Sequence, residues 1–211
     1  MDGCIRCNQP DTLALSASEA KWGNASLSYF LNIVYPGVDS SRIAFNYRKA
    51  ASQLEAVCGV RFTEVASSAQ ANIVAVSGMI DGPWNVLALS QLPNSSSYAG
   101  VLNQTFDQAE QLSDDLMVAM MCHELGHILG LGHLGTGNLM APILDARITK
   151  PQAGDIAELV SRYGLPLPQT TPVVSTASFT AANTGVISLT ISGLPVQAGV
   201  TYDVSITPAS Q

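Results

Sequence analysis

One stretch of the sequence decides how the rest is interpreted: His123-Glu124-Leu125-Gly126-His127-Ile128-Leu129-Gly130-Leu131-Gly132-His133, which holds every histidine of the chain. Helical residues four positions apart share a face, so His123 and His127 would present both imidazoles to one point. Gly130 stands where the backbone must leave the helix, and glycine tolerates the positive φ of such a turn. The turn would bring His133 back to that point. Three neutral imidazoles form a tetrahedral zinc site with one position open for water.

Two further residues fit a hydrolytic metal site. Glu124 is adjacent to the first histidine, where its carboxylate could hydrogen-bond a water at the open position without becoming a ligand. Met140 follows the third histidine closely and precedes Ala141-Pro142. This spacing predicts a tight turn that carries an apolar thioether beneath the site. A helical histidine is usually structural, but a full set of histidines at metal-ligand spacing argues against that alternative.

The apolar pattern outside this stretch predicts strands and helices in alternation. Alternating residues predict a strand over 25–34. Helical spacing predicts a helix that Asp39 or Ser40 caps and that runs to about Cys58, with Gly59 at its C′ position. Shorter strands are expected at 60–65, 72–77 and 101–106, with an irregular stretch at 78–100. Ser113 is the expected N-cap of the histidine-bearing helix, and a third helix is expected at 151–163. This order indicates an α+β or α/β domain.

Composition and charge exclude several functions. The chain has 211 residues, of which 47% are hydrophobic, so it can bury a sizeable core. Its formal net charge is −7 with no basic block, which is a poor basis for binding nucleic acid or an anionic membrane. The apolar runs are too short to span a bilayer. The first residues contain no apolar segment of the kind found in signal peptides.

The cysteines and the C-terminal tail give weaker signals. Cys4 and Cys7 form a CxxC pair without a second half, so a local disulfide or free thiols are expected rather than a zinc ribbon. Cys58 and Cys122 are expected to be buried, inert thiols. After a proline-rich linker that starts at 166, the tail carries a single charged side chain and reads as two strands, at 186–191 and 200–206. This tail is expected to pair with another β-domain or subunit.

The motif and its surroundings resemble the matrixins, zinc endopeptidases of the metzincin clan. The likeness rests on the histidine stretch with Met140 and on three further segments: Asp81-Gly82-Pro83 with Leu87-Ala88, Phe106-Asp107-Gln108-Ala109-Glu110, and Asp155-Ile156 through Tyr163-Gly164. The resemblance implies an α+β, metzincin-like fold. It comprises a twisted mixed β-sheet, an active-site helix and two further helices, to which the tail adds a short C-terminal β extension. The implied organisation is an N-terminal arm at 1–20, a protease domain at 21–165, and the linker and tail at 166–211.

The resemblance also implies roles for individual residues. His123, His127 and His133 would bind zinc, Glu124 would act as general base and acid, and Met140 would be the residue of the Met-turn. A peptide substrate would lie antiparallel along a sheet edge near Val86, Leu87 and Ala88. Asp81, Asp107 and Glu110 match positions at which matrixins hold calcium, although the same carboxylates could instead cap the backbone or be solvated. No propeptide of the usual kind is visible, and Cys4 or Cys7 capping the zinc is a minor alternative.

The function expected from the sequence is zinc-dependent hydrolysis of peptide bonds in a peptide or protein substrate. One alternative is a structural or attachment component of a larger assembly, such as a virion, with this fold and weak or self-processing activity. Another is a zinc hydrolase of non-peptide amides, which the Met-turn and edge-strand matches argue against. Family habit favours an extracellular location or a secreted or virion assembly.

Overall fold

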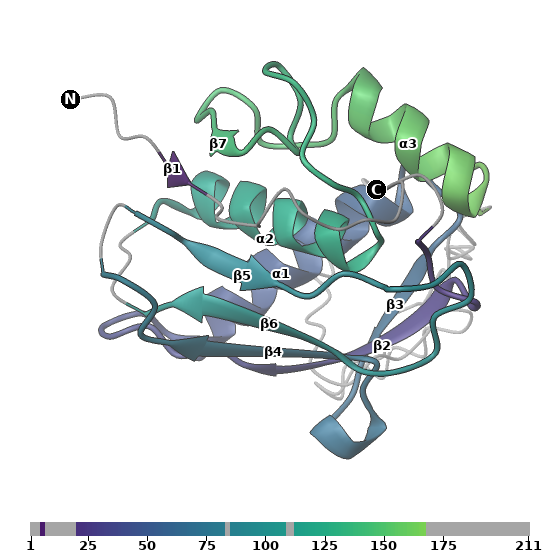
Figure 1. The fold of residues 1–211 in the computed structure, drawn as a ribbon. Coiled ribbons are helices and arrows are strands. Elements are labelled where there is room, and N and C mark those ends of the chain that lie inside the picture. Colours follow the sequence, from purple (N-terminus) through teal and green to yellow (C-terminus); the bar gives the residue numbers. More distant parts are fainter. Residues whose placement is uncertain (1–4, 7–19, 83–84, 109–111, 168–211) are drawn as a thin grey trace, which may run out of the picture. The chain divides into compact units, whose positions relative to one another are not determined.

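The computed structural model describes residues 5–6, 20–82, 85–108 and 112–167. Its main sheet has five strands in the order β3-β2-β4-β6-β5 (Figure 1). The first three pairs in this order are parallel, whereas β5 runs antiparallel to β6 and lies at the edge of the sheet. The strand bounds are Ser26–Asn32 for β2, Arg61–Glu64 for β3, Ile73–Gly78 for β4, Ala88–Ser90 for β5 and Leu102–Asp107 for β6.

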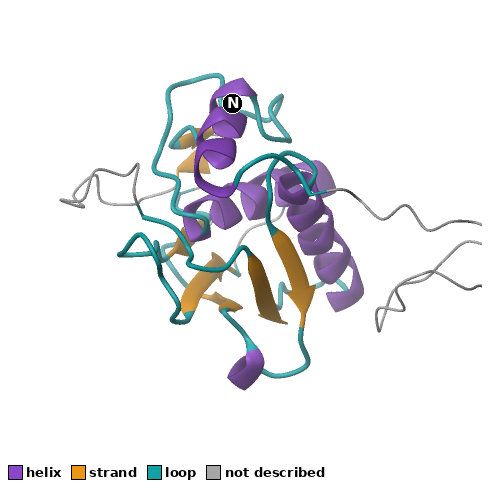
Figure 2. Ribbon diagram, turned by 90° about the vertical axis from the view of Figure 1, so that its right-hand side faces the viewer, coloured by secondary structure: helices purple, strands orange, loops and turns teal. Residues whose placement is uncertain are grey.

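Two helices pack on this sheet, and a third comes after it in the chain. Helix α1 spans Ser40–Glu55 and α2 spans Asp114–Ile128; the two lie against one face of the sheet, as the two orthogonal views show (Figures 1 and 2). Helix α3, Ala153–Tyr163, follows the histidine-bearing region, and a short 3-10 helix, η1, covers Ser68–Gln70. The mixed sheet with three α-helices confirms the predicted α+β, metzincin-like class.

The core lies between the sheet and these two helices. Its fully buried side chains come from both layers, for example Ile73 and Phe106 from the strands and Tyr47 and Met121 from the helices. Burying a side chain of this size stabilises the fold by about 1.5–3 kcal/mol. Nearly every residue of α2 from Met117 to Ile128 is buried. The histidine-bearing helix is therefore a central element of the core, and its side chains have little room to move.

The structure corrects the end predicted for the first helix. Asp39 is its N-cap, as expected, and accepts a hydrogen bond from Ser41 N. The helix ends at Glu55 with Ala56 as C-cap, so Gly59 is not at the C′ position. Gly59 instead packs against the residues after α3: its N–H donates to Gly164 O at 3.1 Å, and a Cβ there would collide with Tyr163 O. Close backbone packing, rather than a helix end, explains this glycine.

Three strands were not predicted from periodicity. β5 lies within the stretch expected to be irregular, although the family resemblance placed an edge strand there. β1, Ile5–Arg6, lies in the predicted N-terminal arm and pairs antiparallel with β7, Ile143–Leu144. Each of these strands has only two or three residues, which is too short for a period of two to be recognised.

The chain divides into two compact units, residues 1–167 and 168–211. The strands predicted at 186–191 and 200–206 lie in the second unit, outside the described residues. The proposed domain bounds and the pairing of the tail therefore stay predictions. Within the described ranges, no helix is long and apolar enough to cross a membrane.

Candidate metal centre

Helix α2 carries the site, and polar contacts fix where it starts. Ser113 caps it by accepting a hydrogen bond from Leu116 N. Asp114 and Asp115 occupy the first turn, where negative charge is favoured by the helix dipole.

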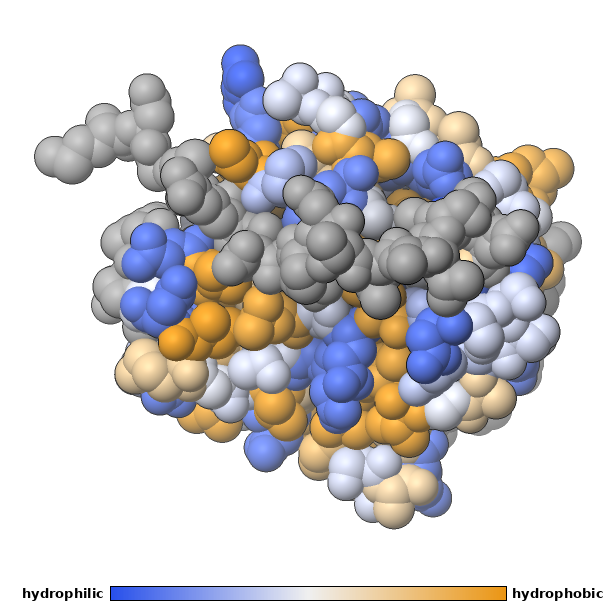
Figure 3. Space-filling model, in the orientation of Figure 1, coloured by the Kyte–Doolittle hydropathy of each residue, from blue (hydrophilic) through white to orange (hydrophobic). Residues whose placement is uncertain are grey.

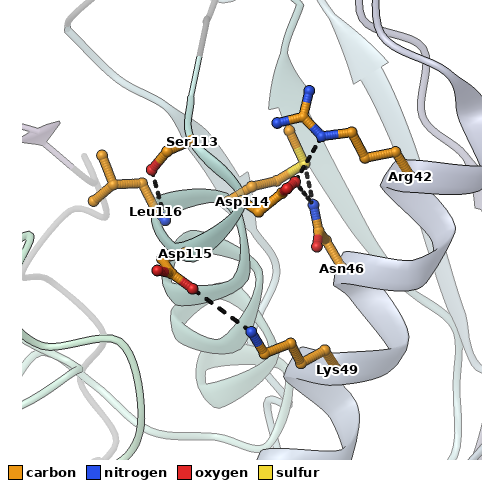
Figure 4. A network of polar contacts seen from close by, with 8 residues as sticks. Arg42, Asn46, Lys49, Ser113, Asp114, Asp115 and Leu116 are labelled. Carbon is orange, nitrogen blue, oxygen red and sulfur yellow. Dashed lines mark hydrogen bonds and ion pairs between the residues drawn. The ribbon is translucent and has the colours of Figure 1, made fainter.

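From α1, the side chains of Arg42, Asn46 and Lys49 reach these two carboxylates (Figure 4). The hydrogen bonds from Asn46 and then Arg42 lower the pKa of Asp114. Because the ion pairs are exposed, each contributes little by itself, but together they connect the first turn of α2 to α1.

Side chains from elsewhere in the fold also fix where α2 ends. Trp22 Nε1 donates to Ile128 O at 2.8 Å, and the Tyr163 hydroxyl donates to Leu129 O at 2.9 Å. The last carbonyls of a helix lack partners within it, so these bonds satisfy them. Gly130 then adopts φ +90°, which confirms the predicted positive φ. A Cβ at this position would also collide with Ala20 O.

The three histidines come together as the spacing predicted. His123 and His127 lie one turn apart on α2 and are buried, and the half-buried His133 returns from the turn after Gly130. One ring nitrogen of each histidine lies within 4.8 Å of those of the other two. His123 Nε2 and His127 Nε2 are 3.0 Å apart. The three imidazoles thus converge on one point.

Backbone carbonyls determine which nitrogen of each helical histidine faces that point. His123 Nδ1 lies 2.8 Å from Leu139 O, and His127 Nδ1 lies 2.8 Å from Leu131 O. Because a carbonyl oxygen only accepts, both Nδ1 atoms carry the proton, and the Nε2 lone pairs are left facing each other. Two lone pairs at this separation repel unless a cation lies between them. The donor set therefore fits a divalent metal ion, with second contacts of the kind that orient metal-binding histidines.

Burial keeps these rings neutral. Desolvation, opposed by the bond to Leu139 and reinforced by His133, lowers the pKa of His123 to about 4. Burial and the neighbouring His123 lower the pKa of His127 well below its usual value. Neutral imidazole is the form that binds metals, so both rings are in the ligating state at neutral pH.

Met140 packs against the histidine-bearing helix α2, in a turn held by a carboxylate for which the sequence predicted no role. It is buried, and a Cβ on Gly126 would collide with its sulfur. The buried Asp155 of α3 accepts hydrogen bonds from Leu139 N at 2.8 Å and Met140 N at 3.0 Å. Leu139 in turn presents its carbonyl to His123. Asp155 thus orients the backbone of Leu139, whose carbonyl orients the His123 ring. Its only sequence signal was its place in the segment resembling the matrixin closing helix.

Glu124 is buried on α2 next to His123. A hydrogen-bonded chain of buried polar side chains lies close by: Tyr47 Oη donates to Gln104 Oε1 at 2.6 Å, and Gln104 Nε2 donates to Ser90 Oγ at 3.1 Å. Burial first, then Tyr29 and Glu124, raise the pKa of Tyr47 well above its usual value. This chain links α1, β6 and β5 around the site. It was not predicted, because its members are far apart in sequence.

The segment expected to bind substrate leads into the edge strand. Val86, Leu87 and Ala88 are buried, so their side chains belong to the core. β5 hydrogen-bonds to β6 on one side and is the last strand of the sheet. Hydrophobic residues reach the surface on the face of the molecule seen in Figure 3, and Leu89 of β5 is 37% exposed. Among the strands that the structure describes, β5 pairs with β6 alone, and a free strand edge is a common place for proteins to bind extended peptides.

The three carboxylates assigned to calcium by resemblance are placed as follows. Asp107 ends β6 and is fully buried, and its Oδ2 accepts hydrogen bonds from the N–H groups of Ile80, Asp81 and Gly82. Asp81 is exposed and its Oδ1 accepts from Val86 N. Glu110 lies outside the described residues. The contacts of Asp107 and Asp81 are those of carboxylates that cap the backbone.

The mixed sheet, the helix with two histidines one turn apart, the returning third histidine and the methionine packed against that helix are the features of a metzincin-type metalloprotease. The family model described as Matrixin matches residues 21–164, and the chain belongs to this family of peptide-hydrolysing enzymes. Matrixins use zinc, and the histidine cluster is a fitting site for it. A comparison with curated proteins finds no match.

Proposed function

We propose that this matrixin is a zinc-dependent endopeptidase in which His123, His127 and His133 hold the metal and Glu124 transfers the protons. The observation that carries the proposal is the convergence of three ring nitrogens within 4.8 Å. Two of the rings have their Nε2 lone pairs aimed at each other. The bound zinc would supply a Lewis acid that polarises the scissile carbonyl and makes water more acidic.

The residues of the chain account for the remaining chemistry. The carboxylate of Glu124 acts first as a general base, taking a proton from the attacking water. It then acts as a general acid and gives that proton to the departing amine nitrogen. Its burial next to His123 keeps bulk water from competing for that proton. The backbone of β5 and the preceding residues 86–88 would grip an extended peptide antiparallel to the strand. Met140 supports the histidines from below and takes no part in proton transfer.

A pair of variants tests this assignment. Glu124→Ala should keep one zinc per chain by mass spectrometry and lose cleavage of an unfolded protein by several orders of magnitude. Asp115→Ala is the matched control, because it removes an exposed carboxylate from the same helix and should cleave as fast as the parent. His133→Ala should reduce the zinc content. Parental cleavage by Glu124→Ala, or full zinc retention by His133→Ala, would refute the corresponding role.

The second candidate is single-use self-processing within a larger assembly. It is favoured by β1, since a strand of the chain's own N-terminal arm pairs with β7, shortly after the Met140 turn. Turnover on a foreign protein, measured with and without a metal chelator, separates the two candidates: repeated chelator-sensitive turnover supports the endopeptidase, and one self-cleavage without turnover supports the alternative. An extracellular or virion-associated location and a tail that pairs with another subunit belong to the same proposal.

The predictions for Cys4 and Cys7 concern residues outside the described ranges.

A further inference from the structure

The loop that leads into the edge strand is built around one buried carboxylate. Asp107 Oδ2 accepts hydrogen bonds from three consecutive backbone N–H groups, at 3.2 Å from Ile80 N and 3.0 Å from both Asp81 N and Gly82 N. Gly82 adopts φ +89°, which allows the backbone to curl around the oxygen. Successive N–H groups that point inward form a concave site for an anion. Here the anion is a side chain of the protein itself.

Asp107 also holds the other end of this loop. Its own N–H donates to Leu87 O at 2.8 Å, immediately before β5, and the next residue, Gln108, donates its N–H to Gly78 O at 2.9 Å. Asp81 Oδ1 closes the loop by accepting from Val86 N at 3.1 Å. The stretch between β4 and β5 is therefore tied to Asp107 at its start through the side chain and at its end through the backbone.

These contacts do not fit a calcium ion at Asp107 Oδ2. Calcium takes six to eight oxygen ligands, whereas the backbone groups turned toward this oxygen are N–H donors, which carry partial positive charge. Three donors leave the oxygen no lone pair to offer. Of the two roles that the sequence left open, the contacts of Asp107 and Asp81 favour capping.

We propose that Asp107 is the positioning residue of the substrate-binding edge, and that its carboxylate organises the loop into β5 without bound calcium. The proposal rests on the proposed endopeptidase function, because it concerns how the edge meets a peptide. The zinc ligands and Glu124 belong to α2 and the turn after it, which Asp107 does not hold. Loss of the carboxylate should therefore loosen the grip on substrate while leaving proton transfer intact.

The experiment compares Asp107→Asn and Asp107→Ala with Asp145→Asn, a control that removes a half-exposed carboxylate paired with the nearby Arg147. The proteins are made calcium-free, loaded with zinc and assayed on a peptide with and without millimolar calcium chloride. Asp107→Asn should raise KM about tenfold, since charged hydrogen bonds are lost, with kcat and zinc content within about twofold of the parent. The parent should show the same KM with and without calcium.

A parent that gains activity or thermal stability when calcium is added would overturn the proposal, as would an Asp107→Asn variant with parental KM. Hydrogen exchange of the amides of residues 80–82 provides a readout that does not need catalysis. In the calcium-free parent these amides should be protected, and in Asp107→Ala they should exchange faster than in the control. A parent that cleaves no peptide would refute the proposed function, and the exchange experiment would still decide the role of Asp107.

Discussion

The contact between Asp155 and the Met140 turn allows a perturbation whose size follows from the structure. Asp155 accepts from Leu139 N, Met140 N and Gln152 N at 2.7–3.0 Å, and it is buried. In Asp155→Asn one carboxylate oxygen becomes an NH₂ group that faces a backbone N–H. A buried hydrogen bond to a charged group contributes about 1.5–3 kcal/mol, and a buried donor left unpaired costs about as much. We expect Asp155→Asn to lower the free energy of unfolding by about 2–3 kcal/mol.

The same substitution should weaken metal binding, because Leu139 O holds the Nδ1 proton of His123. Loss of such an outer contact typically costs a factor of 10–100 in metal affinity. Urea unfolding of the zinc-free protein measures the first effect, and competition with a chromogenic zinc chelator measures the second. Asp145→Asn, which removes a half-exposed carboxylate from the same connection, should change neither quantity. Parental stability and zinc affinity in Asp155→Asn would refute the reasoning that links this carboxylate to the site.

Three further predictions concern packing, pH and the N-terminal arm. Gly126→Ala should destabilise the protein by about 1–2 kcal/mol in thermal unfolding, because overpacking against Met140 outweighs the helix propensity gained; Gly135→Ala, which has open space for a Cβ, should be neutral. Burial raises the pKa of Cys58 to about 11, so as the pH rises the thiol loses its proton in the unfolded chain before it does in the folded one. The free energy of unfolding should therefore fall between about pH 9 and 11, and the fall should be smaller in Cys58→Ala. Deleting residues 1–19 removes β1 from β7, a few residues after Met140 and so close in sequence to the proposed metal site, and should speed peptide cleavage by opening that side of the site; an unchanged rate would show that β1 does not obstruct it.

Much of the site could be predicted from the sequence because its geometry is local. The separation of His123 and His127 by one helical turn follows from helix geometry alone, and Gly130 marks where that helix must end. Within the described residues, the strands and helices expected from periodicity were found within a few residues of their predicted bounds, whereas the short strands β1, β5 and β7 were not expected from it. The methionine turn followed from its distance to the third histidine.

What the sequence by itself determined is therefore the identity of the three converging histidines and the helix that spaces two of them, since both depend on residues close together in the chain. Only the tertiary structure decided what holds them in place. Asp155 reaches the methionine turn from another helix, Asp107 ties the edge loop to the end of a strand, and Gly59 is required by residues more than a hundred positions away. No pattern in the sequence marks such contacts, because hydrogen bonds and close packing depend on which segments the fold brings together, and sequence spacing does not record this.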